Sequence, residues 1–292
     1  MRLPAKPARG LRVLSYNVEH TSPAKNPAPF ARVLSVLQPD VMLFQEWVEG
    51  DDQALRAWLT AHVDDQTTWH VLKGQAWGVA IASRYPLTPA TAVDAPNPVN
   101  PQQPLRFLSA FVQTPAGPVL VGTTHLKCCG TKDSREDRQR LTEATTIADM
   151  VAKALDAPPQ PDDAPAAQPW AVVLGGDMNL VGSRPPLEAL AHGTDLDGSD
   201  LAVAPAQHLG DPVHYTWFDP GNAFTPGRLD YLLYSDASAT AVHAFVLDTT
   251  KLGEAALARL GLDPTDTAAS DHLPLVLDLV PTPAEGSTPA AR

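Results

Sequence analysis

The chain has 292 residues, of which 44% are hydrophobic, and it carries a formal net charge of −12. A chain of this length can bury one large core, although length alone does not exclude two domains. The acidic balance argues against tight, sequence-independent binding of nucleic acid, which needs clustered Lys and Arg, but a local basic groove is compatible with it.

No apolar run in the sequence approaches the ~18 residues of a membrane-spanning helix, so we expect no membrane span. The N-terminal stretch MRLPAKPARG has basic residues without an apolar segment, so we expect no intact signal peptide. The sequence leaves the compartment open between the cytoplasm and a mature exported form.

Predicted strands and helices alternate along the whole chain. In chain order we expect a strand at 11–18, a helix at 27–38, a strand at 40–46, a helix at 52–63, a strand at 78–84, a hairpin of strands at 105–114 and 117–126, a helix at 133–155, a strand at 170–177, a helix at 184–192, strands at 228–235 and 241–248, a helix at 253–261 and a strand at 273–280. Several strands are continuous apolar runs, which indicates that both faces of the sheets are covered. The simplest architecture is α/β, with two packed sheets and helices outside.

Two segments have almost nothing to pack. Residues 156–169 are rich in Pro and Asp and are expected to form an exposed loop, and residues 281–292 are expected to form a tail. The strand after the loop continues the same pattern, so we expect one domain over 1–292 with its core at about 11–280.

Polar side chains stand at or near the ends of the buried strands. Taken singly, each has an ordinary explanation: a turn, a solvated strand end, a cap or a satisfied core histidine. Together the strand ends can bring them to one place, at Asn17, Glu46, His125, Asp177, Asn179, Asp230, Asp271 and His272. Converging carboxylates repel one another and need a cation. Oxygen donors without cysteine favour Mg²⁺ or Mn²⁺, as one or two ions, over zinc.

The ordered motifs SYNV, FQE, GVAIASRYPL, TTHL, GGDMN, YTW…RLDY and SDHLPL resemble those of the endonuclease/exonuclease/phosphatase superfamily, which has the DNase I-like fold. The resemblance covers about residues 11–280. Each motif is short, and their order makes the set specific. The resemblance implies a four-layer αββα sandwich of two mixed β-sheets and the metal-dependent hydrolysis of phosphate esters.

The resemblance also implies roles for the polar residues. Glu46, Asn17 and Asp271 would hold the metal, which polarises a phosphoryl oxygen. Asp177 would orient or deprotonate the attacking water, and Asn179 and His125 would donate hydrogen bonds to the phosphate oxygens. Asp230 would fix the tautomer of His272 and favour its charged form. The two glycines before Asp177 would let the backbone approach the phosphate closely.

The motifs do not select a substrate within the superfamily. The loop after His125 is a candidate substrate loop through Lys127, Cys128, Cys129 and Arg135, although a solvated helix start with internal ion pairs is the more ordinary explanation. Trp77, Trp217 and Phe218 are candidates for stacking on a leaving group. We favour a monomeric phosphodiesterase or phosphomonoesterase that acts on small or generic phosphoesters. A DNA or RNA nuclease is the alternative, so nucleic acid stays a less favoured partner. A non-catalytic binding module of the same fold is disfavoured because no expected ligand is missing.

The only cysteines are the adjacent Cys128 and Cys129. Two reduced thiols, a vicinal disulfide that stiffens the loop and a soft-metal site all fit the pair. Two thiolates fall short of the four ligands of a tetrahedral zinc site. With only two cysteines, the sequence gives little information on whether the compartment is oxidising or reducing.

Overall fold

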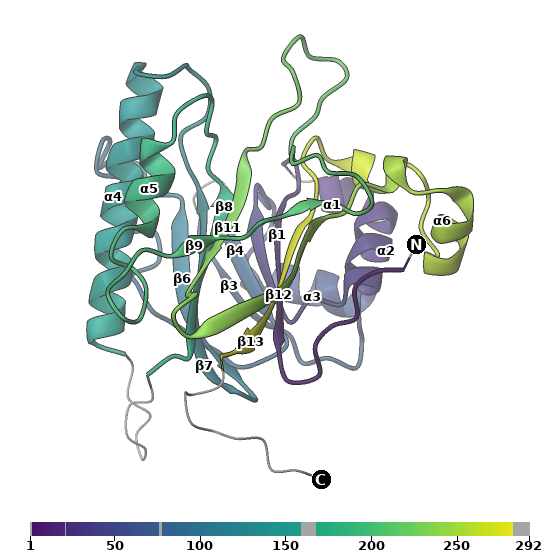
Figure 1. The fold of residues 1–292 in the computed structure, drawn as a ribbon, viewed down its shortest axis with the longest axis horizontal. Coiled ribbons are helices and arrows are strands. Elements are labelled where there is room, and N and C mark those ends of the chain that lie inside the picture. The colour runs from purple at the N-terminus through teal and green to yellow at the C-terminus, as the bar shows by residue number, and fades with distance from the viewer. Residues whose placement is uncertain (1, 21, 76–77, 159–167, 283–292) are drawn as a thin grey trace.

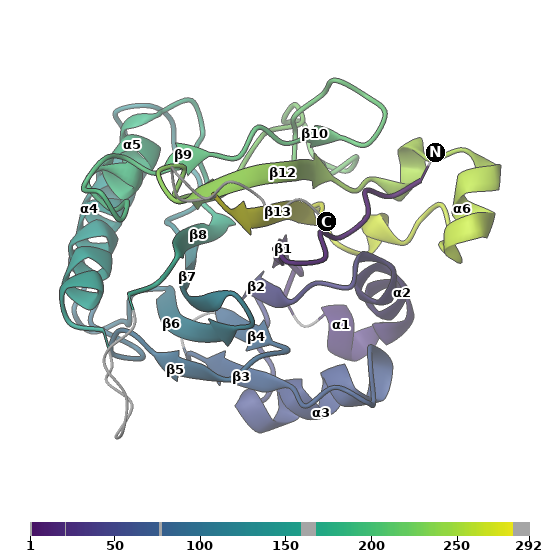
Figure 2. The same ribbon diagram turned by 60° about the horizontal axis from the view of Figure 1, so that its bottom comes forward.

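The computed structural model describes residues 2–20, 22–75, 78–158 and 168–282. Four layers succeed one another: helices, a sheet, a second sheet and helices (Figures 1 and 2). This confirms the predicted αββα sandwich. Residues 159–167 of the expected loop, residues 283–292 of the expected tail, and Trp77 lie outside the described residues.

The first sheet has seven strands in the order β10-β12-β13-β1-β2-β4-β3. Its strands are β1 (Leu11–Asn17), β2 (Val41–Gln45), β3 (His70–Lys73), β4 (Ala80–Ser83), β10 (Gln207–His208), β12 (Ala239–Val246) and β13 (Leu275–Pro281). Its outer face carries α1 (Ser22–Lys25), α2 (Pro27–Leu37), α3 (Asp52–His62) and α6 (Glu254–Leu260) (Figure 2).

The second sheet has six strands in the order β5-β6-β7-β8-β11-β9. Its strands are β5 (Leu87–Pro89), β6 (Phe107–Thr114), β7 (Gly117–His125), β8 (Ala171–Asp177), β9 (Ala202–Val203) and β11 (Asp230–Tyr234). Its outer face carries α4 (Arg135–Asp156) and α5 (Pro185–Ala191). Both sheets contain parallel and antiparallel pairs, such as β7 with β8 and β8 with β11.

Three apolar clusters fill the three spaces between the layers. Alternate residues of β1 show the pattern: Leu11 and Val13 belong to the cluster between the sheets, whereas Leu14 and Tyr16 pack in the cluster under α2 and α3. The third cluster joins α4 and α5 to the second sheet. Because every central strand is covered on both faces, its sequence reads as a continuous apolar run.

Local sequence explains the helix ends. Ser134 begins α4 by accepting a hydrogen bond from the Asp137 amide, so the helix starts two residues after the expected position. Gln38 ends α2, and Gly261 ends α6, both in the left-handed conformation. No helix among the described residues is long and apolar enough to cross a membrane.

Short elements escaped the sequence patterns. The strands β3, β5, β9 and β10 and the helix α1 have two to four residues each, which is less than one period of a reliable pattern. The expected strand at 228–235 forms only from Asp230, because Leu229 and Asp230 donate their backbone N–H groups to the Thr216 hydroxyl instead.

Candidate active site

Three neighbouring strands of the second sheet bring His125, Asp177 and Asp230 side by side. His125, the last residue of β7, pairs in register with Asp177, the last residue of β8, and Asp177 pairs with Asp230, the first residue of β11. Side chains that are opposite one another on adjacent strands point to the same face. All three are buried, and His125 Nε2 lies 3.5 Å from Asp177 Oδ2.

The first sheet contributes Asn17 and Glu46 to the same place. Asn17 ends β1 and is fully buried, and its Nδ2 donates to Glu46 Oε1 and to Asp177 Oδ2, both at 3.2 Å. Glu46 follows β2 in the left-handed conformation, at φ +62°, which a glutamate adopts only when its surroundings hold it. The Asn17 amide therefore connects the carboxylates supplied by the two sheets.

The two glycines before Asp177 have a different reason from the one expected. A Cβ on Gly176, at φ +141°, would collide with the Thr124 carbonyl of β7, and a Cβ on Gly175 would lie 2.5 Å from Leu232 Cδ2. The glycines thus allow β8 to fit between its neighbours and against the first sheet. The sequence interpretation, close approach to a phosphate, stays a prediction, and the contacts with the neighbouring strands account for both glycines without it.

His272 and Asp230 form a buried hydrogen-bonded pair. The His272 Nδ1 lies 2.7 Å from Asp230 Oδ2, and the opposite ring nitrogen, Nε2, lies 3.7 Å from Asp177 Oδ2. Burial alone would lower the pKa of His272, but the negative charges of Asp230 and Asp177 outweigh it and raise the pKa to about 10. The imidazole is therefore held in its charged form at neutral pH.

The pKa of Asp177 is raised above that of an exposed aspartate. Burial raises its pKa to about 7, against the lowering influence of the His272 charge, and the nearby Asp230 raises it further. The Asn179 backbone N–H and the Asn17 side chain donate to its two oxygens. A carboxyl with a pKa near 7 exchanges a proton readily at physiological pH.

His125 is a neutral imidazole. Burial first, and then the positive charge of Arg106, hold its pKa well below the usual value. Its Nδ1 is buried and has no hydrogen-bond partner among the described residues. A buried orphan nitrogen is costly unless a ligand or water satisfies it.

Asn179 lies at the edge of this group. It has a left-handed backbone, at φ +49°, and its Nδ2 donates to the Leu126 carbonyl at 3.2 Å. Asparagine tolerates this conformation better than most residues. The Asn179 side chain thus bonds to a backbone carbonyl one residue after His125.

Asp271 lies on the other side of His272 and outside the row of three strands. Its Oδ2 accepts a 2.8 Å hydrogen bond from the Trp217 indole, and its backbone N–H donates to Glu19. Trp217 therefore orients a carboxylate, and stacking on a leaving group, the use that its sequence suggested, has no support in this contact. The pKa of Glu19 is raised by burial and then by the charges of Asp271 and Glu46.

Two groups of donors suit a cation. Glu46, Glu19 and Asp271 form a set of carboxylates, in which burial and then the charges of Asp271 and Glu46 raise the pKa of Glu19. Asp177, Asp230 and His272 place one potential ligand atom each within 4.8 Å of one another. The second set includes an imidazole that is hydrogen-bonded to Asp230 through Nδ1, whereas the first set offers only oxygen atoms, which a hard ion such as Mg²⁺ prefers.

The loop after His125 is held by a fully buried guanidinium. Arg140 donates to the carbonyls of Lys127 and Cys129 at 2.9 and 2.7 Å. Cys128 and Cys129 are free thiols with their Sγ atoms 2.9 Å apart. Arg135 is exposed at the start of α4, and no hydrogen bond or ion pair joins it to a site residue in the described part of the chain. The charge of Lys127 acts on His125, whereas no hydrogen bond or ion pair joins Arg135 or either thiol to a site residue within the described residues.

Sequence reasoning missed three residues of the site. Glu19 and His20 follow Asn17 by two and three residues. The backbone nitrogen of His20 and its ring Nδ1 both contact Glu46. Arg106 lies immediately before β6 and acts on His125. An acid so soon after a strand-end asparagine is a signal that could have pointed to Glu19, whereas nothing in the sequence distinguishes Arg106 from a surface arginine.

Comparisons with known proteins agree with this geometry. A family model described as "Endonuclease/Exonuclease/phosphatase family" matches residues 14–272. No curated protein matches the chain.

Solved structures resemble the fold at low sequence identity. A humanized D. rerio TDP2 has a TM-score of 0.56 at 17% identity, covering 94% of this chain and 100% of its own. Sphingomyelinase C from Streptomyces griseocarneus has a TM-score of 0.57 at 19% identity, covering 92% of this chain and 99% of its own. ANGEL2, a 2',3'-cyclic phosphatase, has a TM-score of 0.59 at 16% identity, covering 92% of this chain and 95% of its own.

Proposed function

The chain belongs to the endonuclease/exonuclease/phosphatase family, and from this premise we propose that it is a metal-dependent phosphoesterase acting on small or generic phosphodiesters and phosphomonoesters. Endonucleases, exonucleases and phosphatases all hydrolyse phosphoester bonds, so hydrolysis of such a bond follows from membership. The finer proposal concerns the residues and the substrate.

The observation that carries the proposal is the convergence of three buried groups: His272 Nε2 lies 3.7 Å from Asp177 Oδ2, and His272 Nδ1 lies 2.7 Å from Asp230 Oδ2. The pKa of Asp177 is raised to about 7, whereas that of His272, 3.7 Å away, is raised to about 10. One carboxylate can therefore take a proton at neutral pH while its neighbour keeps a positive charge. Hydrolysis of a phosphoester needs both properties, a base for the water and a cation for the developing negative charge.

In the proposed mechanism, Asp177 orients a water molecule for in-line attack on phosphorus and accepts its proton. The charged His272, kept in one tautomer by Asp230, stabilises the anionic transition state. His125 and Asn179 contact the non-bridging oxygens. His125 Nε2, which lies 3.5 Å from Asp177 Oδ2 and 3.8 Å from Glu46 Oε1, supports such a role for this ring nitrogen.

Glu46, Asn17 and Asp271 would hold the divalent ion, with Glu19 as a further oxygen ligand. When bound, a Mg²⁺ or Mn²⁺ ion polarises a phosphoryl oxygen and neutralises negative charge. The residues fit such an ion, since the set offers only oxygen ligands, and burial and then the charges of Asp271 and Glu46 raise the pKa of Glu19. One or two ions remain compatible with the proposal.

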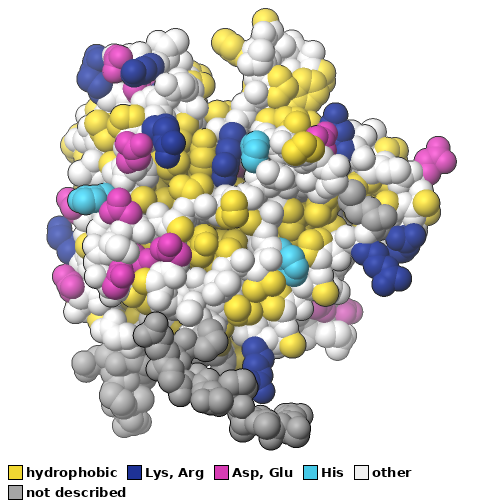
Figure 3. Space-filling view, in the orientation of Figure 1, with side chains coloured by type: hydrophobic (Ala, Val, Ile, Leu, Met, Phe, Trp, Pro, Cys, Tyr) yellow, Lys and Arg dark blue, Asp and Glu magenta, His cyan; other side chains and the backbone are white. Residues whose placement is uncertain are grey.

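Charge favours a small substrate over a polynucleotide. The chain has a net charge of −12, and on the face shown in Figure 3 the Lys and Arg side chains of the described residues stand among acids and form no continuous basic surface. A nuclease is the second candidate, because D. rerio TDP2 is described in complex with single-strand DNA product.

We also propose that residues 1–292 form one domain that acts as a monomer.

A substrate panel tests the proposed function. Bis-p-nitrophenyl phosphate, p-nitrophenyl phosphate, plasmid DNA, RNA and sphingomyelin are compared with Mg²⁺ or Mn²⁺, and Asp177→Asn serves as the control for contaminating enzymes. We expect turnover of the nitrophenyl esters that disappears with chelator. Turnover of plasmid DNA or RNA alone would establish the nuclease instead.

A further inference from the structure

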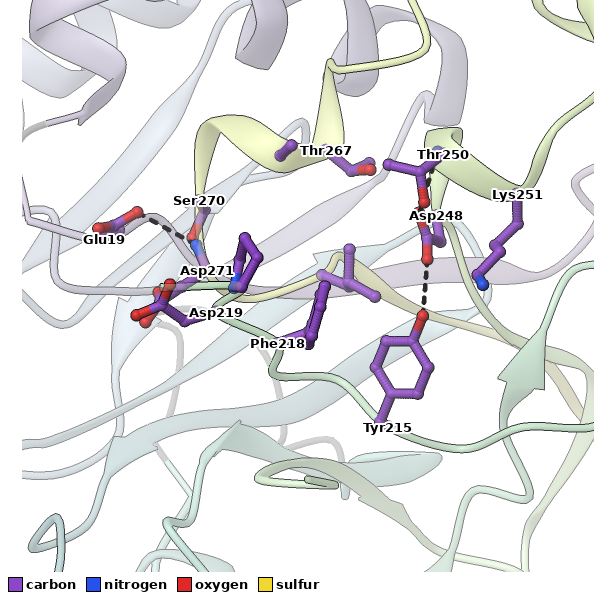
Figure 4. A pocket seen from close by; sticks show the side chains of 13 residues that line it. Glu19, Tyr215, Phe218, Asp219, Asp248, Thr250, Lys251, Thr267, Ser270 and Asp271 are labelled. Carbon is purple, nitrogen blue, oxygen red and sulfur yellow. Dashed lines mark hydrogen bonds between the residues drawn. The ribbon is translucent and has the colours of Figure 1, made fainter. Parts of the chain in front are cut away.

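A pocket of about 390 Å³ opens beside the proposed metal ligands (Figure 4). Glu19 and Asp271 form one end of its lining, Lys251 and Thr250 form the other, and Phe218 and Tyr215 lie between. The family-matched motifs supply only part of this wall. The other part comes from η1 (Thr249–Lys251) and from η2 (Thr267–Ala269) with the residues after it.

The acids of the pocket already have partners or lie at the metal end. Asp248 accepts hydrogen bonds from the Tyr215 hydroxyl at 3.0 Å and from the Thr250 hydroxyl and backbone N–H at 2.6 and 3.0 Å. Asp219 accepts from the Gly221 amide, and its charge acts on Glu19. Asp248 therefore keeps its negative charge at the far end, where neutral hydroxyl and amide donors occupy its oxygens.

Lys251 is the unpaired charge of the pocket. It is exposed, and no ion pair or hydrogen bond engages its ammonium within the described residues. The pKa of Tyr215 is raised to about 12 by burial and then by Asp248, so the phenol beside Lys251 stays neutral. Lys251 is thus the basic side chain of the lining at the end away from the metal ligands, near the hydrogen-bonded carboxylate of Asp248.

The middle of the pocket is apolar and aromatic. The Phe218 ring is 45% exposed, and it packs edge-on against Tyr215 with ring centroids 6.3 Å apart. Leu273 completes this wall. An exposed aromatic face held by a second ring suits a flat or apolar group of the ligand.

We propose that this pocket is a specificity subsite for a small phosphodiester that carries a second anionic group. Phe218 and Tyr215 contact the apolar or aromatic part of the substrate, and Lys251 binds its distal anion while the scissile phosphate lies at the metal end. This inference rests on the proposed function, since that function places the reacting phosphate beside Asp271 and Glu19.

Two nitrophenyl esters that differ only in the distal anion test the subsite. Thymidine 5'-(4-nitrophenyl phosphate) and its 3'-phosphorylated form have the same scissile bond and leaving group. We expect the wild-type enzyme to have a lower KM for the 3'-phosphorylated ester. Lys251→Ala should raise that KM about 5- to 10-fold, a loss of about 1 to 1.4 kcal/mol, and leave kcat and the other ester within twofold.

Conservative and aromatic variants separate charge from packing. Lys251→Arg should restore the low KM, and Phe218→Ala should raise the KM of both esters. Lys153→Ala, in the last turn of α4, and Phe224→Ala, at an exposed ring outside the pocket lining, are the matched controls and should change neither. An equal effect of Lys251→Ala on both esters, or none on either, overturns the subsite.

Direct binding keeps the subsite testable without turnover. Calorimetry with thymidine 3',5'-bisphosphate and thymidine 5'-monophosphate should show a Kd that Lys251→Ala weakens about 5- to 10-fold for the bisphosphate alone. If the wild-type protein binds in this way and hydrolyses neither ester, the proposed function fails and the subsite stands. If it hydrolyses both and Lys251→Ala changes neither KM nor Kd, the subsite fails and the function stands.

Discussion

His272 Nδ1 lies 2.7 Å from Asp230 Oδ2, although 42 residues separate them in the sequence. The pair joins the first residue of β11 to the segment that enters β13. The negative charge of Asp230 raises the pKa of His272 against the effect of burial. Several measurable consequences depend on this contact and on its neighbour Asp177.

Asp230→Asn should shift the alkaline limit of activity to lower pH. In the wild type the charges of Asp230 and Asp177 outweigh burial and raise the pKa of His272 to about 10, so we expect a charged imidazole at neutral pH. Without the carboxylate, burial dominates and the pKa falls. The pH profile of kcat/KM and the NMR titration of His272 should both move down by at least one unit. An unchanged alkaline limit would show that Asp230 does not set the charge of His272.

The pair of His272 and Asp230 also determines how the stability of the folded protein changes with pH. Because the pKa of His272 is raised in the folded protein, the stabilisation by the ion pair is complete below its ordinary pKa of 6.5 and is lost as pH rises through about 10. Metal-free wild-type protein should therefore lose melting temperature over this interval. Asp230→Asn should show a smaller slope between the same limits.

Asp177→Asn and His272→Ala should each lower kcat by at least two decades without unfolding the chain. Both groups are proposed to act on the reacting phosphate, and neither fills a large apolar space. Steady-state kinetics with saturating metal measures the loss, and circular dichroism checks the fold. The exposed Asp236→Asn and His192→Ala are matched controls expected to retain activity. Near-normal turnover in either site variant would refute its assigned role.

Asp177→Asn should also make the metal-free protein more stable at alkaline pH. Burial raises the pKa of Asp177 to about 7, so ionisation costs folding free energy that is absent below the ordinary pKa of 3.8 and present once pH rises through about 7. The variant removes that cost. Its melting temperature should exceed that of wild type by a few degrees at pH 8 and equal it at pH 4. A lower melting temperature at pH 8 would contradict the assignment.

Glu46→Gln should weaken binding of Mn²⁺ by at least one order of magnitude. It removes a charged oxygen from the proposed ligand set, whereas Glu49→Gln removes an exposed carboxylate three residues away. Calorimetric titration with Mn²⁺ measures the two dissociation constants. Equal affinity in both variants would place the ion elsewhere, and the set of Asp177, Asp230 and His272 would become the candidate.

Alanine at both Cys128 and Cys129 should retain most of kcat and change KM or the mobility of the loop. The loop is anchored by Arg140 through the carbonyls of Lys127 and Cys129, and these contacts do not need the thiols. Kinetics and hydrogen exchange over 127–134 measure the two effects. Mass spectrometry with and without reductant detects a vicinal disulfide as a two-hydrogen deficit, since closing it removes two hydrogen atoms. Total loss of activity with fold and metal intact would give a thiol a chemical role.

Long apolar strands and their polar ends could be predicted from sequence because burial on both faces is visible in composition. Asn17, His125, Asp177 and Asp230 stand where strand endings put them, and the αββα layers follow from the alternation of elements. The use of Asp271 could not be predicted in the same way. Its contact with the Trp217 indole joins segments 54 residues apart, and no local pattern records which donor a carboxylate will meet.

The roles of the glycines and of the short connections could not be predicted from the sequence either. The sequence shows that Gly175 and Gly176 precede an acid, but only the neighbouring strands reveal that Thr124 and Leu232 are what exclude a side chain there. Glu19 and His20 lie in a connection rather than a strand, and their left-handed backbones, both at φ +49°, turn them toward Glu46. Such conformations follow from tertiary contacts and leave little trace in residue type.

The register of β7, β8 and β11 has a consequence for how the protein can vary. His125, Asp177 and Asp230 occupy one row of the sheet, so the spacing between neighbours is fixed at about 4.8 Å by interstrand hydrogen bonding. Insertions or deletions in the connections between these strands change no distance within the row. A shift of any one strand by a single residue would instead turn its functional side chain to the opposite face. The connections between these strands can therefore change in length during divergence, whereas the pairing register of the strands cannot shift by one residue.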